Sequence, residues 1–245
     1  MTHKTKGIVL RALKYGETSV ITTIYTSLFG LQSYIVKGVR KASKNNSVKA
    51  NYFQPAAVLQ LEVYNNELKN LQFIKEFQWE YLYNKIYSDV MRNAAATFVT
   101  ELVLRSIKQP ETNAELFSFI EEALLKIDNG TDMLVANIPV YFSIQFAAAL
   151  GFQVHGEYSD TLFIFDLSEG NFISEIPARA TYLAGEDAKI ISQLNEATSF
   201  EFAEKIKMNK NTRRHLLENM QQYFTLHIPD FGEIKSLKVL FEIFN

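Results

Sequence analysis

The sequence predicts a multi-domain α and β chain. A small five-stranded β-barrel at the amino terminus is followed by an α-helical domain with a small β excursion. In residues 1–80 apolar side chains tend to alternate with polar ones, whereas from Trp79 onward they recur at intervals of three and four. Charge divides similarly: residues 1–80 carry 11 Lys and Arg against 5 acidic residues, and the remainder carries 14 against 22. We place the domain boundary at residue 80, which gives domains 1–80 and 81–245.

Five segments of the first domain have the composition and spacing of β-strands. Residues 19–26 are rich in β-branched side chains and place Val20, Thr22 and Ile24 on one face. The strands are expected at 6–13, 19–26, 31–38, 57–64 and 70–78, with turn signals between them. Five short strands of this spacing fit a small closed barrel, which is the architecture of the oligonucleotide-binding (OB) fold.

The second domain is predicted to be mainly helical. Helices are expected at 93–107, 113–127 and 133–152, with Thr112 or Asn113 as the cap of the second one. An apolar stripe (Leu216, Leu217, Met220, Tyr223, Phe224 and His227) predicts a further helix, and residues 233–244 predict the last. Residues 155–184 form the β excursion, with strands expected at 161–167 and 171–176.

One segment, residues 133–154, has no charged residue and is long enough to cross a bilayer. It contains Asn137, Pro139 and Gln145 and lacks a flanking basic cluster, so a helix buried inside a soluble bundle explains it better. The amino terminus shows no signal peptide and the chain has no cysteine. We therefore expect a cytoplasmic protein without disulfides, thiolate metal sites or membrane attachment.

Motifs of catalytic chemistry are absent from the sequence. There is no P-loop, no GxGxxG after a strand, no HExxH and no GxSxG, and the 4 histidines are scattered. A nuclease would need clustered carboxylates for metal ions; Asp160, Asp166 and Glu169 are the available candidates, and turn positions explain them better. We expect the protein not to be an enzyme.

The charged side chains of the segment KGVRKASKNNSVKA, residues 37–50, are all positive, and we call this segment the basic loop. It holds Lys37, Arg40, Lys41, Lys44 and Lys49 and no acid, and it lies between two predicted strands, where OB barrels carry binding loops.

Other residues of the first domain extend this basic character. Lys6, Arg11 and Lys14 add positive charge, and nearby aromatic residues, Tyr34 among them, could stack nucleobases. The pattern predicts binding of single-stranded nucleic acid. Contact of the loop with an acidic protein partner is the alternative, and an ordinary solvated surface is the simplest explanation.

The order of several short motifs resembles the bacterial DNA repair and recombination protein O (RecO) family. The first strand leads to a YGE turn at 15–17, followed by KGVRKAS at 37–43 and QPAAVLQLEVY at 54–64. YFSIQFAAALGFQ at 141–153 and LHIPDFGEIKSLKVL at 226–240 are similar to later family segments. The resemblance covers most of the chain in order.

This resemblance implies an OB barrel on a helical domain without catalysis. Family members bind single- and double-stranded DNA and anneal complementary strands. With RecR they help load RecA onto DNA coated by single-strand-binding protein (SSB). The family's basic loop falls on Lys37, Gly38, Arg40, Lys41 and Lys44. The SSB tail, acidic and apolar, would need an apolar groove with a basic rim; the candidates are Arg213, Arg214, Leu216 and Leu217, although an ordinary helix start explains these residues equally well.

The sequence departs from the family pattern at one place. Many members carry a four-cysteine zinc site after the helix that ends near 151, and this chain has no cysteine. The excursion at 155–184 is expected to keep its hairpin, with apolar side chains in place of the metal. No zinc and no other cofactor are therefore predicted.

Overall fold

The structure is a computed structural model that describes residues 1–39, 51–66, 68–177 and 181–243. The chain forms two compact units: residues 1–84 with 100–124, and residues 85–99 with 125–245. Residues 100–124, which are helical in large part, therefore pack with the amino-terminal segment. The domain boundary at residue 80 remains a prediction.

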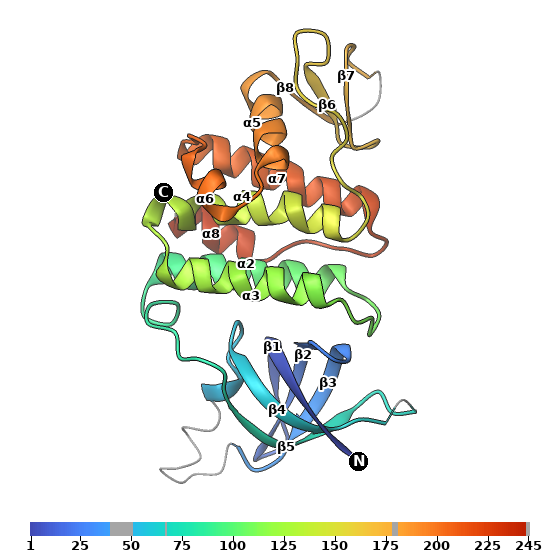
Figure 1. Ribbon diagram of the computed structural model, residues 1–245, viewed down its shortest axis with the longest axis vertical. Helices are drawn as coiled ribbons and strands as arrows, with labels where there is room; N and C mark the ends of the chain where they lie inside the picture. Colours follow the sequence, from blue (N-terminus) through green and yellow to red (C-terminus); the bar gives the residue numbers. More distant parts are fainter. Residues whose placement is uncertain (40–50, 67, 178–180, 244–245) are drawn as a thin grey trace. The chain divides into compact units, whose positions relative to one another are not determined.

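Five strands of the first unit form a closed barrel (Figure 1). They are β1 (Thr2–Tyr15), β2 (Ser19–Thr26), β3 (Gly30–Val36), β4 (Val58–Tyr64) and β5 (Gln72–Trp79), in the order β1-β2-β3-β5-β4. Only the β3–β5 pair is parallel. Strand β1 is long enough to pair with both β2 and β4, which closes the barrel and confirms the predicted architecture.

The barrel interior is filled from all five strands and the segments between them. Val20, Thr22 and Ile24 are buried, as the alternation in residues 19–26 predicts. A short 3₁₀ helix, Asn51–Phe53, contributes Phe53 to the core. Irregularities interrupt the register of β1 between Val9 and Arg11 and of the β4–β5 pair at Glu62 and Val63. The core residues are Val9, Val20, Ile24, Tyr34, Val36, Val39, Phe53, Ala57, Leu59, Leu61 and Val63.

Helices α2 (Val90–Ser106) and α3 (Ala114–Asn129) follow the barrel in sequence. The Asn113 side chain accepts a hydrogen bond from the Leu116 backbone N–H, so Asn113 is the cap of α3. Within the first unit, the Tyr25 ring stacks on Phe117, with ring centroids 6.2 Å apart. One part of the barrel's outer surface is thereby covered.

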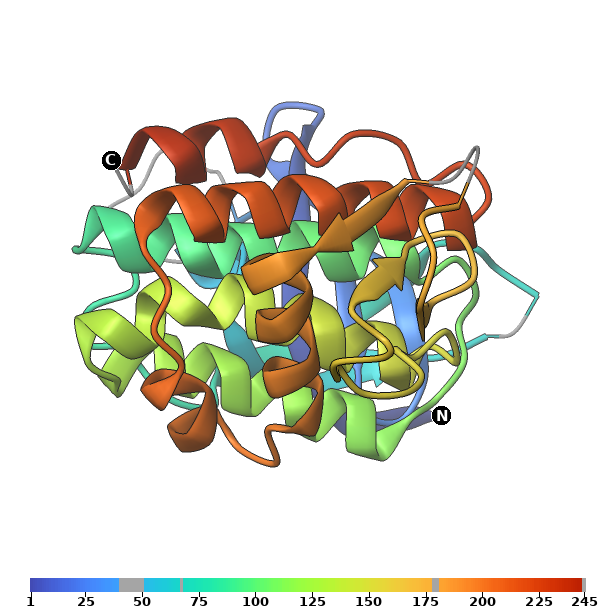
Figure 2. The ribbon, with the colours of Figure 1, turned by 90° about the horizontal axis from the view of Figure 1, so that it is seen from above.

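Helix α4 (Asp132–Ala149) is the core of the second unit and packs against α5 (Gly185–Glu196), α6 (Phe200–Lys205) and α7 (Lys210–His227) (Figures 1 and 2). Among the described residues α4 is the one helix with the length and composition of a membrane span, and 72% of it is buried inside the structure. Such burial is typical of the core helix predicted for this segment. The Thr131 side chain caps it through the Leu134 N–H. Helix α8 (Ser236–Ile243) ends the described chain.

The β excursion is a three-stranded sheet in the order β7-β6-β8. Strands β6 (Ile164–Asp166) and β7 (Asn171–Ile173) confirm the expected hairpin in shorter form. The third strand, β8 (Tyr182–Ala184), and the helices α5 and α6 were not predicted from the sequence. Phe165 and Phe172 pack together inside this sheet with ring centroids 5.3 Å apart.

Candidate nucleic-acid interface

A row of apolar and aromatic side chains crosses the outside of the barrel. The strand register pairs Leu13 with Ile21, Ile21 with Ile35, Ile35 with Phe73, and Phe73 with Tyr64. Their strand neighbours on the opposite face fill the core, so these five residues point outward. Leu13, Phe73 and Tyr64 are 47%, 41% and 46% exposed. We call these five residues the outer row.

The basic loop begins directly beside the outer row. The Lys37 ammonium lies over the Phe73 ring, 5.3 Å from its centroid, which is a cation–π contact. A hollow of about 270 Å³ lies at this point and includes Ile35, Lys37 and Phe73 in its lining. Gly38 has φ +73°, a left-handed conformation that glycine adopts readily, so this residue shapes the start of the loop.

The other lysine in this hollow, Lys75, is bound to a carboxylate. Its ammonium donates to Glu62 Oε1 at 2.7 Å, and this bond raises the pKa of Lys75. The same hydrogen bond, together with one from Thr2, lowers the pKa of Glu62. The Lys37 ammonium is therefore the cation placed over the Phe73 ring, and Lys75 is engaged elsewhere.

Two further predicted basic residues lie at the far end of β1. Arg11 pairs with Thr23 and Lys14 pairs with Val20, and both side chains are exposed. Arg11 shares the outward face with Leu13 and with Tyr15, which is 52% exposed. This end of the hairpin therefore combines positive charge with an exposed aromatic ring.

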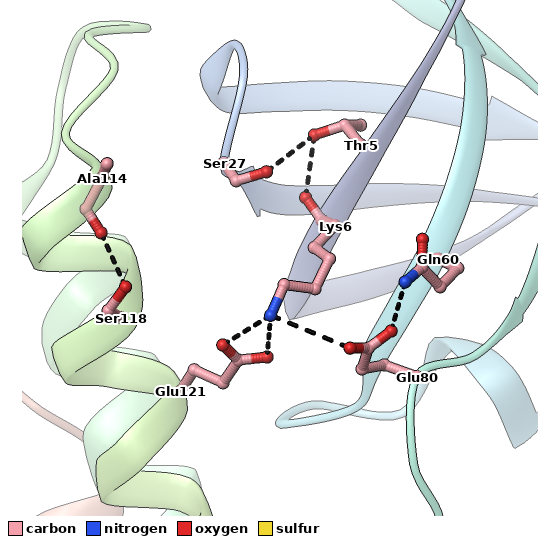
Figure 3. Close-up of polar contacts among 8 residues, drawn as sticks. All are labelled: Thr5, Lys6, Ser27, Gln60, Glu80, Ala114, Ser118 and Glu121. Atoms are coloured by element: carbon pink, nitrogen blue, oxygen red, sulfur yellow. Dashed lines mark hydrogen bonds and ion pairs between the residues drawn. The ribbon is translucent and has the colours of Figure 1, made fainter.

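Lys6 has a different environment from Arg11 and Lys14 (Figure 3). Its ammonium lies 2.8 Å from both carboxylate oxygens of Glu121 and 3.8 Å from Glu80 Oε1. Gln60, the cross-strand neighbour of Lys6, donates to Glu80 as well. Lys6 thus joins β1 to residue 121 of the same unit and is already paired with carboxylates.

Tyr34, which the sequence analysis assigned to base stacking, is buried. It is 1% exposed and belongs to the barrel core, because it pairs with Thr22 on the inward face of β2. Burial raises the pKa of its phenol. The assignment of Tyr34 to DNA contact is therefore wrong. The other residues of the basic loop that were predicted to bind DNA lie outside the described residues; they are Arg40, Lys41, Lys44 and Lys49.

A separate groove lies in the second unit, where α7 and α8 contribute to one surface. Its cavity volume is about 90 Å³, and Arg213, Arg214, Leu217, Leu240 and Phe241 are part of its lining. The Arg214 guanidinium lies over the Phe241 ring, 4.9 Å from the centroid, and its Nε donates to Glu218. The groove is thus apolar with a basic edge.

Arg213 and Leu216 have largely structural positions in α7. Arg213 donates to the Met208 carbonyl and to Asn137, and burial lowers the pKa of its guanidinium. Leu216 is 0% exposed and packs in the interior. Leu216 is therefore not available to a partner, and its assignment to the partner site is wrong, whereas Arg214 and Leu217 remain at the groove.

Comparison with known proteins gives the same family over both parts of the chain. The family model described as recombination protein O N terminal matches residues 1–83, and the one described as recombination protein O C terminal matches residues 87–238. The chain belongs to the RecO family.

Relatives named DNA repair protein RecO match over their full length or nearly so. Those of Phocaeicola vulgatus and Bacteroides fragilis are each 32% identical over 246 residues and cover 100% of both chains. That of Christiangramia forsetii is 31% identical over 241 residues, 98% of both chains. The recognised motifs therefore reflect membership of a DNA repair family.

The part of this RecO chain that the structure describes contains no group of three or more His, Cys, Asp or Glu side chains that could hold a metal ion. Asp166, one of the acidic candidates, has a turn role: its Oδ1 accepts from the backbone N–H groups of Ser168 and Glu169. The centre of the excursion is apolar and includes the buried rings of Phe165 and Phe172.

The exposed members of the outer row were not predicted from the sequence. Strict alternation along β5 places Phe73 on the same face as Phe77, inside the barrel. The irregularity in the β4–β5 pairing instead leaves Phe73 outside while Ile74 and Phe77 pack on the core. Nothing in the sequence around Gln72 and Phe73 indicates this bulge.

Proposed function

We propose that this RecO protein grips single-stranded DNA along the outer row and the adjoining basic loop. The observation that carries the proposal is the Lys37 ammonium over the exposed Phe73 ring, at the root of a loop with four further basic residues. Aromatic rings stack on unpaired bases of any sequence, and lysines neutralise the phosphates. We expect little preference for base sequence, because neither contact reads base edges.

A single strand fits this surface better than a duplex does. Stacking on Phe73 and Tyr64 needs bases whose faces are free, and the faces of paired bases are covered by their neighbours. Duplex DNA would be held by the basic loop through phosphate contacts alone. A protein that holds single strands in this way leaves base edges open for pairing, which is suited to annealing complementary strands.

In the cell we propose a mediator role. The protein would bind and anneal DNA strands and, together with RecR, help load RecA onto single-stranded DNA coated by SSB. It would act in the cytoplasm as a non-catalytic protein without zinc or another cofactor. Membership of the RecO family supports this role, as does the absence of catalytic motifs from the sequence.

The groove of the second unit is the proposed site for the SSB tail. An acidic peptide that ends in apolar residues would place its carboxylates at Arg214 and its apolar side chains against Leu217 and Phe241. Arg214→Ala should weaken binding of a synthetic tail peptide about tenfold, the equivalent of one charge-assisted hydrogen bond. Lys205→Ala, an exposed charge change outside the groove lining, should not. Equal binding by wild type and Arg214→Ala would exclude this site.

DNA binding is tested by fluorescence anisotropy of a labelled single-stranded oligonucleotide over a salt series. Wild type is compared with a variant in which Lys37, Arg40, Lys41 and Lys44 are alanine. Each lost phosphate contact should reduce the slope of log affinity against log salt by about 0.7. If wild type does not bind, or if the variant binds equally with the same slope, the loop's charge serves another purpose. A barrel that contacts an acidic protein partner then becomes the better account.

A further inference from the structure

Four large apolar side chains of the β excursion are exposed. Leu162 and Phe163 lead into β6, Ile176 follows β7, and Tyr182 begins β8; their exposed fractions are 38%, 39%, 63% and 38%. Strand β6 pairs with both other strands (Figure 1). Strands of 3 residues make a sheet only about 10 Å long and 10 Å wide, so the four side chains lie at the margins of one small area.

The excursion is already fixed to helix α7. The Phe165 ring lies against Tyr223, with ring centroids 5.8 Å apart, and His227 Nε2 lies 3.0 Å from the Leu167 carbonyl oxygen. Gly170 has φ +69°, and a Cβ at this position would lie 2.6 Å from the Tyr223 hydroxyl. The sheet is therefore held in place through its buried side, and the exposed side chains are presented on a rigid support.

The same segment is strongly acidic. Residues 155–187 carry 7 Asp and Glu against one Lys or Arg, and that residue, Arg179, lies outside the described residues. Asp166 accepts hydrogen bonds in its turn, and Asp187 Oδ2 lies 2.5 Å from His215 Nδ1. The other carboxylates are exposed and form no ion pair with any residue that the structure describes; they are Glu157, Asp160, Glu169, Glu175 and Glu186.

This combination of groups selects one class of partner. Exposed apolar side chains bordered by polar ones mark sites of protein interaction. Unpaired carboxylates repel phosphate, so the surface is unsuited to DNA, to anionic lipids and to acidic peptides. They attract Lys and Arg, whose stems can also pack on apolar side chains. The chemistry that fits is a polypeptide segment that carries basic and apolar residues together.

We propose that the excursion docks a protein partner through a segment in which Lys or Arg alternates with apolar side chains. The apolar side chains pack on Phe163 and Ile176. The cations pair with Asp160, two residues before Leu162, and with Glu175, directly before Ile176. This surface is opposite in charge to the basic loop, so one chain can hold DNA and a basic protein at different sites.

The apolar contribution is tested with the full chain and a short labelled peptide in which lysine alternates with leucine. Wild type should bind it, more weakly as salt is raised. Phe163→Ser/Ile176→Ser keeps every charge, so its affinity should fall about tenfold or more while the salt dependence persists. The control Leu28→Ser/Val90→Ser removes side chains that are 51% and 66% exposed elsewhere and should bind like wild type.

A second pair of substitutions tests the charges. Asp160→Asn/Glu175→Gln keeps the apolar side chains and should weaken binding about 2- to 30-fold, as expected for two exposed ion pairs, with a smaller dependence on salt. The control Glu115→Gln/Glu122→Gln makes the same change in net charge at exposed positions of the first unit and should bind like wild type. Thermal unfolding shows that each variant is folded.

Several results would contradict the proposal. It is wrong if wild type does not bind the peptide, or if the control pairs lose as much affinity as the excursion pairs. It is also wrong if a single-stranded oligonucleotide displaces the peptide, or if the excursion pairs lose affinity for DNA, because the patch would then belong to the DNA site. Sedimentation velocity tests for a second copy: if wild type dimerises and Phe163→Ser/Ile176→Ser is monomeric, the occupant is this chain itself and not a basic partner.

Discussion

Replacement of Lys6 separates a structural role from a DNA-binding one. The sequence predicts Lys6 as a DNA contact together with Arg11 and Lys14, whereas in the structure its ammonium pairs with Glu121 and Glu80. Lys6→Met keeps most of the apolar stem and removes the charge. We expect lower stability of the folded protein and unchanged affinity for single-stranded DNA.

The magnitude follows from the geometry and exposure of this cluster. At an effective dielectric of about 20, unit charges 2.8 Å apart attract by roughly 6 kcal/mol, but desolvation and side-chain ordering offset most of that. The side chains of Lys6, Glu121 and Glu80 are 33%, 15% and 24% exposed. The cluster therefore lies between an exposed pair, worth about 0–1 kcal/mol, and a buried charged hydrogen bond, worth about 1.5–3 kcal/mol. We expect Lys6→Met to lower the free energy of unfolding by about 1–2 kcal/mol.

The assay combines urea unfolding with DNA anisotropy on the same preparations. Lys4→Met is the matched control, because Lys4 is exposed on the same face of β1 two residues earlier and should change stability by less than about 0.5 kcal/mol. In the Glu121→Gln background, Lys6→Met should cost less than in wild type, which measures the coupling of the pair. If Lys6→Met unfolds like wild type and its salt slope for DNA binding falls by about 0.7, Lys6 contacts a phosphate and the structural role is wrong.

Three further predictions concern single side chains. Phe73→Ala should weaken binding of single-stranded DNA about 5- to 150-fold with an unchanged salt slope, because stacking contributes about 1–3 kcal/mol per base. Phe73→Trp keeps an aromatic ring and should retain binding. A loss of binding in both variants would contradict stacking. Gly30→Ala should lower the free energy of unfolding by more than about 2 kcal/mol, since it adds a 2.2 Å contact with Glu111 to the strain of a left-handed residue. Gly16 has φ +57° and no heavy atom within 4 Å of an added Cβ, so Gly16→Ala should lose only the stability that the left-handed strain costs. Equal urea midpoints for Gly16→Ala and Gly30→Ala would therefore contradict the predicted clash with Glu111. Asn137→Leu should cost about 2–4 kcal/mol in urea unfolding, because the carbonyls of Ala203 and Ile206 lose their donor inside the second unit; a loss below about 1 kcal/mol would show that those carbonyls find other partners.

The barrel was predictable from sequence because its signals are local. Alternation in residues 19–26 and 57–64 identified the inward faces, and Ala57, Leu59, Leu61 and Val63 are buried as expected. Asn113 acts as a cap at one of the two positions proposed for it. Apolar spacing likewise predicted α4 and α7, whose buried sides pack in the second unit.

The errors concern relations between distant segments. Tyr34 faces inward because β3 pairs with β2 in the register that sets it opposite Thr22, and composition does not determine that register. Phe73 faces outward because of the irregular β4–β5 pairing. The partner of Lys6 is 115 residues away in sequence, so no local pattern could have revealed it.

Helices α5 and α6 were missed because they are short. Helix α5 has 12 residues and α6 has 6, so neither offers many turns over which an apolar period could be recognised. The third strand of the excursion, Tyr182–Ala184, has only 3 residues and its pairing with β6 depends on the tertiary fold.

The most direct test of DNA binding by the outer row is photo-crosslinking of the wild-type protein to single-stranded DNA that contains 5-iodouracil. The crosslinked protein is then digested with trypsin and analysed by mass spectrometry. This base reacts preferentially with aromatic rings on which it stacks. Phe73 is the one aromatic residue of the tryptic peptide 70–75, so a crosslink there is unambiguous. The account predicts crosslinks in peptide 70–75 and in the peptide that contains Tyr64. Crosslinks confined to the second unit, with none on the barrel, would contradict it.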